Sequence, residues 1–207
     1  MLYIYMYTFI ITMSSLHSFL LTMMIIPLSS TLLLMASPSH ADQTYVREAC
    51  NVTRYRDLCI RYLSPYSNSA KRSHHKWAQA AVAVTMEEAK RTGKLLNIIR
   101  ARGRMRRRQM AALSDCLECF EETMDNAARS AEELRRLSSE KSTFEVQMGN
   151  VETWMSAALT FEDTCLDGFD EVRKGKVVKQ LRREVVKVSC ITSNALALVA
   201  KLASVGG

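Results

Sequence analysis

The sequence predicts an all-α fold: an antiparallel up-down-up-down four-helix bundle with an N-terminal disulfide-linked helical hairpin. Three observations support this prediction. The 207 residues include only seven Gly and three Pro, too few turn formers for a β-sandwich or barrel. Four long stretches carry apolar residues three and four positions apart, which is typical of amphipathic helices. Short breaks separate these stretches, so we expect consecutive helices to be antiparallel neighbours.

Each of the four stretches contributes one apolar stripe to a shared core. The first stripe contains Ala78, Val82, Thr85, Ala89, Thr92, Leu96 and Ile99. The second contains Leu113, Leu117, Phe120, Met124, Ala127, Ala131 and Leu134. The third contains Phe144, Met148, Val151, Met155, Ala158, Cys165, Phe169 and Val172. The fourth contains Val178, Leu181, Val185, Val188, Thr192, Ala195, Val199 and Leu202.

The predicted breaks carry residues that begin or end helices. Gly103 lies between the first two stretches, and Ser138-Ser139 end the second. Ser142 and Glu145 have the spacing of a capping box at the start of the third helix. Gly175 separates the third helix from the fourth.

The N-terminal segment 1–41 reads as a secretory signal peptide. It contains no Lys, Arg, Asp or Glu, and it ends in Ser39-His40-Ala41, where small residues permit cleavage after Ala41. An uncleaved membrane anchor is the alternative, since about 18 apolar residues can span a bilayer. The predicted organisation is therefore a leader over 1–41, a helical hairpin extension over 42–70 and the bundle over 71–207.

Six cysteines follow this leader, at positions 50, 59, 116, 119, 165 and 190, and in a secreted chain most of them should be oxidised. A zinc site would need a second pair beside Cys116-x-x-Cys119, so we predict no metal and no cofactor. A local bridge between Cys50 and Cys59 would fit two short helical pieces over 44–63.

The bundle topology also bears on the remaining four cysteines. Cys116 and Cys165 fall at matching levels of antiparallel neighbouring helices, within reach of a disulfide. Cys119 and Cys190 fall on diagonal helices, where direct pairing is less natural. We expect one or both to remain as buried or poorly reactive thiols.

The formal net charge is +7, which in a secreted protein favours acidic polysaccharide as a partner over nucleic acid. Six arginines cluster within nine residues at the first helix turn, either as a polyanion dock or as a solvated turn. They are Arg100, Arg102, Arg104, Arg106, Arg107 and Arg108.

Other polar features point to few functional groups. Asn51-Val52-Thr53 is a candidate N-glycosylation site at Asn51. The carboxylate pairs Asp163 with Asp167 and Glu121 with Glu122 are expected to lie on solvated helix faces. No histidine lies near a candidate nucleophilic serine in sequence, and no glycine-rich phosphate loop is present, so the sequence does not predict an enzyme. Trp77 is expected to pack in the core, and Trp154 is either a part-buried packing residue, which its helical position favours, or a binding hot spot.

Four blocks of the sequence occur in a recognisable order: the segments from Cys50 to Cys59, from Ala112 to Glu118, from Trp154 through Asp163 to Phe169, and from Thr192 to Leu198. Together they resemble the plant invertase/pectin methylesterase inhibitor family. The resemblance covers residues 44–204 and implies a non-enzymatic helical bundle with disulfides Cys50–Cys59 and Cys116–Cys165. Arg56 and Cys119 depart from the family pattern, which usually has Pro and an apolar residue there.

The resemblance implies a secreted inhibitor of the plant apoplast and cell wall, and its two branches differ in their target enzyme. One branch covers the active-site cleft of pectin methylesterase in a one-to-one complex, and the other binds acid invertase through a Pro-Lys-Phe-like loop. This chain has Arg173-Lys174-Gly175-Lys176 at that turn, which favours pectin methylesterase. Acid invertase inhibition and a non-inhibitory bundle that binds polyanions or, through the leader, membranes are the alternatives.

The partner should dock on the groove between the second and third bundle helices, because rigid helices position side chains reliably and the Cys116–Cys165 bridge would pin this pair. Polar and acidic residues off the apolar stripes are the candidate contacts. They are Glu118, Glu122, Asp125, Glu152, Ser156 and Thr160.

Overall fold

The computed structural model describes residues 40–172 and 174–206, so the predicted leader lies outside the described residues apart from its last two positions. Within these ranges every regular element is helical, as predicted. The bundle helices are α5 (His74–Ala101), α6 (Arg107–Arg135), α7 (Lys141–Asp167) and α8 (Lys176–Val205). The shorter elements are α2 (His40–Ala49), η1 (Cys50–Val52), α3 (Arg56–Leu63), η2 (Ser64–Tyr66), α4 (Ser67–Ala70) and η3 (Asp170–Val172).

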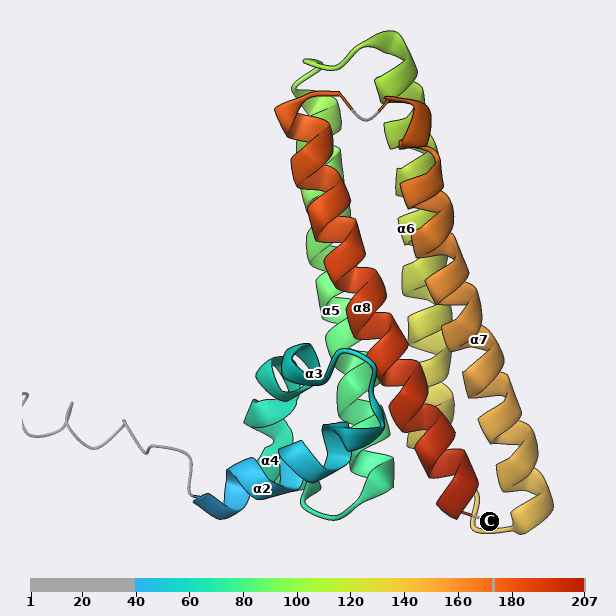
Figure 1. The fold of residues 1–207 in the computed structure, drawn as a ribbon. Coiled ribbons are helices and arrows are strands. Elements are labelled where there is room, and N and C mark those ends of the chain that lie inside the picture. The colour runs from blue at the N-terminus through green and yellow to red at the C-terminus, as the bar shows by residue number, and fades with distance from the viewer. Residues whose placement is uncertain (1–39, 173, 207) are drawn as a thin grey trace, which may run out of the picture. The chain divides into compact units, whose positions relative to one another are not determined.

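The four long helices form the predicted up-down-up-down bundle (Figure 1). Helix α5 packs against α6 and α8, and α7 packs against the same two helices, so α6 and α8 lie on a diagonal. The two interhelical turns at one end join α5 to α6 and α7 to α8, and the C-terminus lies at the other end.

The apolar stripes form the core of this bundle. All members of the first and fourth stripes are buried, and in the second and third only Met124, Ala131 and Val172 are partly exposed. Burial of these side chains is the main favourable contribution to folding, at about 25 cal/mol per Å² of apolar surface. Helix α8 is long and apolar enough to span a bilayer by composition, but its stripe is buried between α5 and α7.

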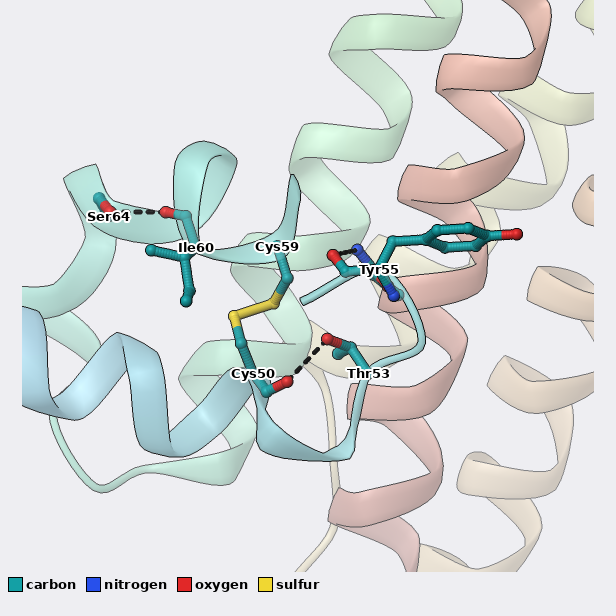
Figure 2. Close-up of a disulfide and its surroundings, with 7 residues drawn as sticks. Cys50, Thr53, Tyr55, Cys59, Ile60 and Ser64 are labelled. Carbon is teal, nitrogen blue, oxygen red and sulfur yellow. Dashed lines mark hydrogen bonds between the residues drawn. A yellow bond between two sulfur atoms is a disulfide. The ribbon is translucent and has the colours of Figure 1, made fainter. Parts of the chain in front are cut away.

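The N-terminal extension packs against helices α5 and α8 of the bundle. A disulfide joins Cys50 to Cys59 with a Cα–Cα distance of 5.9 Å, and beside it the Thr53 hydroxyl donates to the Cys50 carbonyl over 2.8 Å (Figure 2). Both cysteines are buried in one cluster with Trp77 of α5. The extension holds a further short helix, α4, that the sequence reading did not include.

A buried carboxylate also joins the extension to the bundle. Glu88 of α5 is buried, and it accepts a hydrogen bond from the Tyr62 hydroxyl of α3 over 3.3 Å. Two cations balance its charge: Arg91 at 2.8 Å and Lys187 of α8 at 3.2 Å. Such pairing is what makes a buried charge tolerable.

The helix boundaries agree with the sequence at the glycines and differ elsewhere. Gly103 and Gly175 have φ of 60° and 120°, which only glycine adopts without strain. Helix α6 ends at Arg135, three residues before Ser138.

The predicted capping box at the start of α7 is wrong. Helix α7 begins at Lys141, and its N-cap is Glu140, not Ser142. The hydroxyls of Ser142 and Thr143 each donate to the Glu140 carboxylate over 2.9 Å. These bonds hold the pKa of Glu140 below its ordinary value. The negative charge of Glu140 also interacts favourably with the positive end of the helix dipole.

Candidate functional site

The pair α6 and α7 is fixed at two levels. A disulfide joins Cys116 to Cys165, with a Cα–Cα distance of 4.4 Å and both residues buried; this is the pairing that the resemblance implies. About two turns further along α6, the Thr123 hydroxyl donates to the Ala158 carbonyl of α7 over 3.3 Å. Cys116 and Thr123 are seven residues apart, as are Ala158 and Cys165, so these residues mark the facing lines of the two helices.

The six predicted contact residues lie on the solvent-exposed sides of the two helices and do not gather along the groove between them, where the sequence predicts the dock. At about 100° per residue, Glu118 and Asp125 each lie two positions beyond a facing residue of α6 and so point away from α7. Ser156 and Thr160 lie two positions on either side of Ala158 and point away from α6 in the same manner. All six reach solvent, with Glu152 the least exposed.

Hydrogen bonding already uses one of these groups. The Thr160 hydroxyl donates to the Ser156 carbonyl one turn earlier over 3.0 Å. Its oxygen therefore remains available to a partner as an acceptor.

The exposed face of α6 is strongly acidic. Five of its side chains between positions 115 and 125 are exposed carboxylates, and no Lys or Arg occurs between Arg108 and Arg129. They are Asp115, Glu118, Glu121, Glu122 and Asp125. None of the five is ion-paired within the part of the chain that the structure describes. The sequence prediction named three of them and omitted Asp115 and Glu121.

The carboxylates on this face also affect the pKa of Cys119, which is half-buried and has a free thiol. Burial raises its pKa, and the charges of Asp115 and Glu118 raise it further. Because the thiolate is the reactive form, Cys119 should react slowly. Cys190, the other free cysteine, is half-buried on α8, where it interacts with the Tyr55 hydroxyl.

The arginine cluster is positively charged, in contrast to the acidic face of α6, and it lies at an exposed end of the bundle. All six arginines are exposed from the last turn of α5 to the first turn of α6, at the end of the molecule where both interhelical turns lie (Figure 1). Among the described residues none of them is ion-paired; Arg100 bonds only to the Asn97 amide oxygen, over 2.8 Å.

Gln109 ties the two turns of this end together. Its amide nitrogen donates to the carbonyls of Val172 and Lys174 over 3.1 and 2.7 Å, and its oxygen accepts from the Arg106 backbone over 3.2 Å. A cavity of about 420 Å³ lies between the turns, lined by Arg106, Arg107, Arg108, Glu171 and Lys174 among others.

The remaining predicted positions divide between surface and core. Asn51 is exposed next to the buried Thr53, so its amide is accessible for modification. Trp77 is buried and Trp154 partly buried, consistent with packing roles.

A four-helix bundle with an N-terminal helical extension, one disulfide in that extension and another between its second and third long helices, defines the class of protein. A model of the family described as plant invertase/pectin methylesterase inhibitor matches residues 44–198. The chain belongs to this family.

Individual relatives agree. The chain is 45% identical over 161 residues to Pectinesterase inhibitor 6 of Arabidopsis thaliana, covering 77% of this chain and 76% of the relative. It is 36% identical over 179 residues to the 21 kDa protein of Daucus carota, covering 85% and 93%. The crystal structure of a mutant pectin methylesterase inhibitor from Arabidopsis superposes with a TM-score of 0.60 at 21% identity, covering 73% of this chain and 92% of that one, which supports the fold.

Proposed function

We propose that this protein is a secreted inhibitor of pectin methylesterase that binds the enzyme one-to-one and covers its active-site cleft. The observation that carries the proposal is the 45% identity to a protein named as a pectinesterase inhibitor, across 77% of the chain. Membership of an inhibitor family supports a binding role rather than a catalytic one.

The exposed surface of α6, which carries the carboxylates, together with the solvent-facing side of α7, is the surface proposed to meet the enzyme. The disulfide and the Thr123 bond make it rigid, and a preorganised surface loses less entropy on binding. Its unpaired carboxylates favour a partner with positive charge around its cleft, and such pairing would speed encounter at low salt.

Acid invertase is the second possible target, because the family description includes both enzymes. The residues around the α7–α8 turn, with Lys174-Gly175-Lys176 after η3, contain no Pro-Lys-Phe sequence. This absence is the reason to place pectin methylesterase first.

The test is to follow methanol release from esterified pectin by several plant methylesterases, and sucrose cleavage by acid invertase, with and without the purified protein. We expect slower methanol release and unchanged sucrose cleavage. Undiminished methanol release together with inhibited invertase would instead assign the protein to the other branch.

Secretion forms part of the proposal. Two disulfides in the described residues fit an oxidising compartment, and the uncharged segment 1–41 fits a cleaved leader. Cleavage after Ala41 would remove the first two residues of α2, which begins at His40. Sequencing the N-terminus of the protein recovered from a culture medium tests this: an intact leader in a membrane fraction would contradict it.

A second function is proposed for the arginine cluster, namely binding of acidic polysaccharide. Six exposed arginines without ion pairs among the described residues lie at one end of the bundle, and three of them, Arg106, Arg107 and Arg108, line a cavity there. Guanidinium groups pair well with carboxylates. Retention on immobilised polygalacturonate should fall steeply with salt. Equal retention of a variant with Arg104, Arg106 and Arg107 replaced by Ser would refute this dock.

A further inference from the structure

A second cavity, of about 400 Å³, lies between the N-terminal extension and the bundle, near the C-terminal end of α8. Its walls come from α2, η1, the turn between α4 and α5, the start of α5, and α8. A volume of this size is within the range of small-molecule sites. The lining residues come from positions as far apart in the sequence as Tyr45 and Lys201, so only the fold brings them together.

The cavity is positively charged. Lys71, Arg72 and Lys201 line it, with Glu48 as the one carboxylate, and His74 adds an imidazole. None of the three cations has an ion-pair partner among residues 43–172 and 174–206. Lys201 is half-buried, so its charge is less screened by solvent than that of a fully exposed lysine. An anion is therefore the ligand that this cavity favours.

The backbone at Lys71 is strained. Its φ of 47° and ψ of −116° make it the one non-glycine residue with positive φ in the described chain. Glycine would adopt this conformation without steric cost. The Trp77 indole nitrogen donates to the Lys71 carbonyl over 2.8 Å, and the Ser73 amide donates to the Ala70 carbonyl over 2.9 Å. These two bonds hold the turn that directs Lys71 and Arg72 to the cavity, and strain of this kind is concentrated at ligand sites.

Aromatic surface completes the lining. Tyr45 is half-buried and Trp77 is buried, and both line the cavity. Because Trp77 is buried and its indole N–H is bonded to the Lys71 carbonyl, it supports the wall from within, and Tyr45 is the aromatic side chain that a ligand can reach. The Glu48 carboxylate offers acceptors for hydroxyl groups. The lining thus combines cations, an aromatic wall and an acceptor.

We propose that this cavity binds an acidic sugar, with the carboxylate held by Lys71, Arg72 and Lys201, the pyranose ring against Tyr45, and a hydroxyl on Glu48. The site is separate from the α6–α7 face, and it would act whether or not the protein inhibits a methylesterase.

Isothermal titration of the purified protein with galacturonic acid tests the proposal. Saturable binding in the millimolar range or tighter is expected. The methyl ester of the same sugar, glucose and inorganic phosphate serve as comparison ligands, and each should bind at least about tenfold more weakly. Equal binding of the ester or glucose would show that the carboxylate is not recognised. Equal binding of phosphate would show a general anion site, and the absence of saturable binding would show that the cavity is not a binding site. Each of these results would overturn the proposal.

Two variants locate the site. Arg72→Gln and Lys201→Gln should each weaken binding of galacturonic acid about tenfold. The matched control is Lys94→Gln, an exposed lysine on α5 outside the cavity lining, which should bind as the unaltered protein does. Unchanged affinity in both cavity variants would overturn the assignment.

Lys71→Gly separates strain from charge. Glycine removes the strained conformation and the cation together, so the melting temperature should rise while the affinity for galacturonic acid falls about tenfold. A higher melting temperature with unchanged affinity would exclude Lys71 from the site and overturn the proposal as stated.

Discussion

The side-chain amide of Asn194 forms a pair of hydrogen bonds with the backbone of Tyr55. The Asn194 amide nitrogen donates to the Tyr55 carbonyl over 2.9 Å, and the Tyr55 N–H donates to the Asn194 amide oxygen over 3.0 Å. The two residues are 139 positions apart, and Asn194 is buried on α8. The bundle thus bonds both backbone groups of Tyr55, and the first turn of α3 adds a bond from the Cys59 N–H to the Tyr55 carbonyl over 2.9 Å.

Asn194→Ala should therefore loosen the extension. The Tyr55 N–H would lose its partner, and the Tyr55 carbonyl would keep only the Cys59 N–H, which costs about 1–3 kcal/mol of unfolding free energy. Hydrogen exchange at the Tyr55 amide should accelerate more than exchange in the middle of α6. Ser193→Ala, at the neighbouring half-buried position, is the matched control and should leave both quantities unchanged. Slow exchange at Tyr55 in the Asn194 variant would contradict this role.

Glu162 is the second polar residue on which the bundle depends. It is fully buried on α7, and burial raises its pKa to about 8, more than the Thr192 hydroxyl lowers it. The Thr192 oxygen lies 2.7 Å from Glu162 Oε1 and 3.1 Å from the Val188 carbonyl. A protonated Glu162 can donate to Thr192, which in turn donates to Val188, so the neutral acid fits this site.

Stability should consequently fall as the pH rises. The folded-state pKa of about 8 lies above the ordinary value of 4.5, so the folded protein binds more protons between these values. The stabilisation from Glu162 is fully present below about pH 4.5 and is lost progressively towards pH 8, with a slope of up to about 1.4 kcal/mol per pH unit. Denaturant unfolding across pH 5–8 measures it. Glu162→Gln should flatten the profile, whereas Glu121→Gln, at an exposed position, should not; equal slopes in all three proteins would be evidence against it.

The Cys116–Cys165 bridge should contribute more stability than any other pairwise contact between α6 and α7. It joins positions 49 residues apart, and chain entropy assigns a loop of this length about 4 kcal/mol. Replacing Cys116 and Cys165 by Ala should lower the melting temperature far more than Cys119→Ala, because Cys119 is a free thiol one turn away. Peptide mapping that linked Cys119 to Cys165 would disprove the pairing.

The bundle could be predicted from the sequence because its helices are amphipathic and its turns carry Gly103 and Gly175. Periodicity reports which residues face a core, and nearly every stripe residue is buried. The same periodicity also predicts that Glu162 is buried, because it lies four residues after Ala158 and three before Cys165 on the third apolar stripe. This prediction was missed when the stripe was read from apolar residues alone.

Other features could not be predicted from local pattern. The strained turn at Lys71 contains no glycine, so nothing in the sequence marks its positive φ. The cavity beside it joins α2 to α8, and its lining depends on how the extension docks. Glu140 is the N-cap residue of α7, and its carboxylate accepts from the hydroxyls of Ser142 and Thr143, whereas the spacing of Ser142 and Glu145 had indicated a cap at Ser142.

The last prediction distinguishes the two proposed binding surfaces. Replacing Glu122, Asp125 and Glu152 by Lys reverses the charge of the α6–α7 face at positions that reach solvent, so the fold should persist. Inhibition of methylesterase should weaken on the order of a hundredfold, since opposed charges at an interface cost several kcal/mol. Binding to polygalacturonate should not fall.

The matched variant replaces Arg104, Arg106 and Arg107 by Ser. Arg106 is the N-cap of α6, and Ser is a preferred N-cap residue, so this helix should still begin at the same place. Retention on polygalacturonate should drop and its salt dependence should flatten, while the inhibition constant for methylesterase should stay unchanged. Circular dichroism and melting curves of both variants would verify that they are folded. If the arginine variant alone lost inhibition, the enzyme would dock at the end of the bundle, and the α6–α7 face would be excluded.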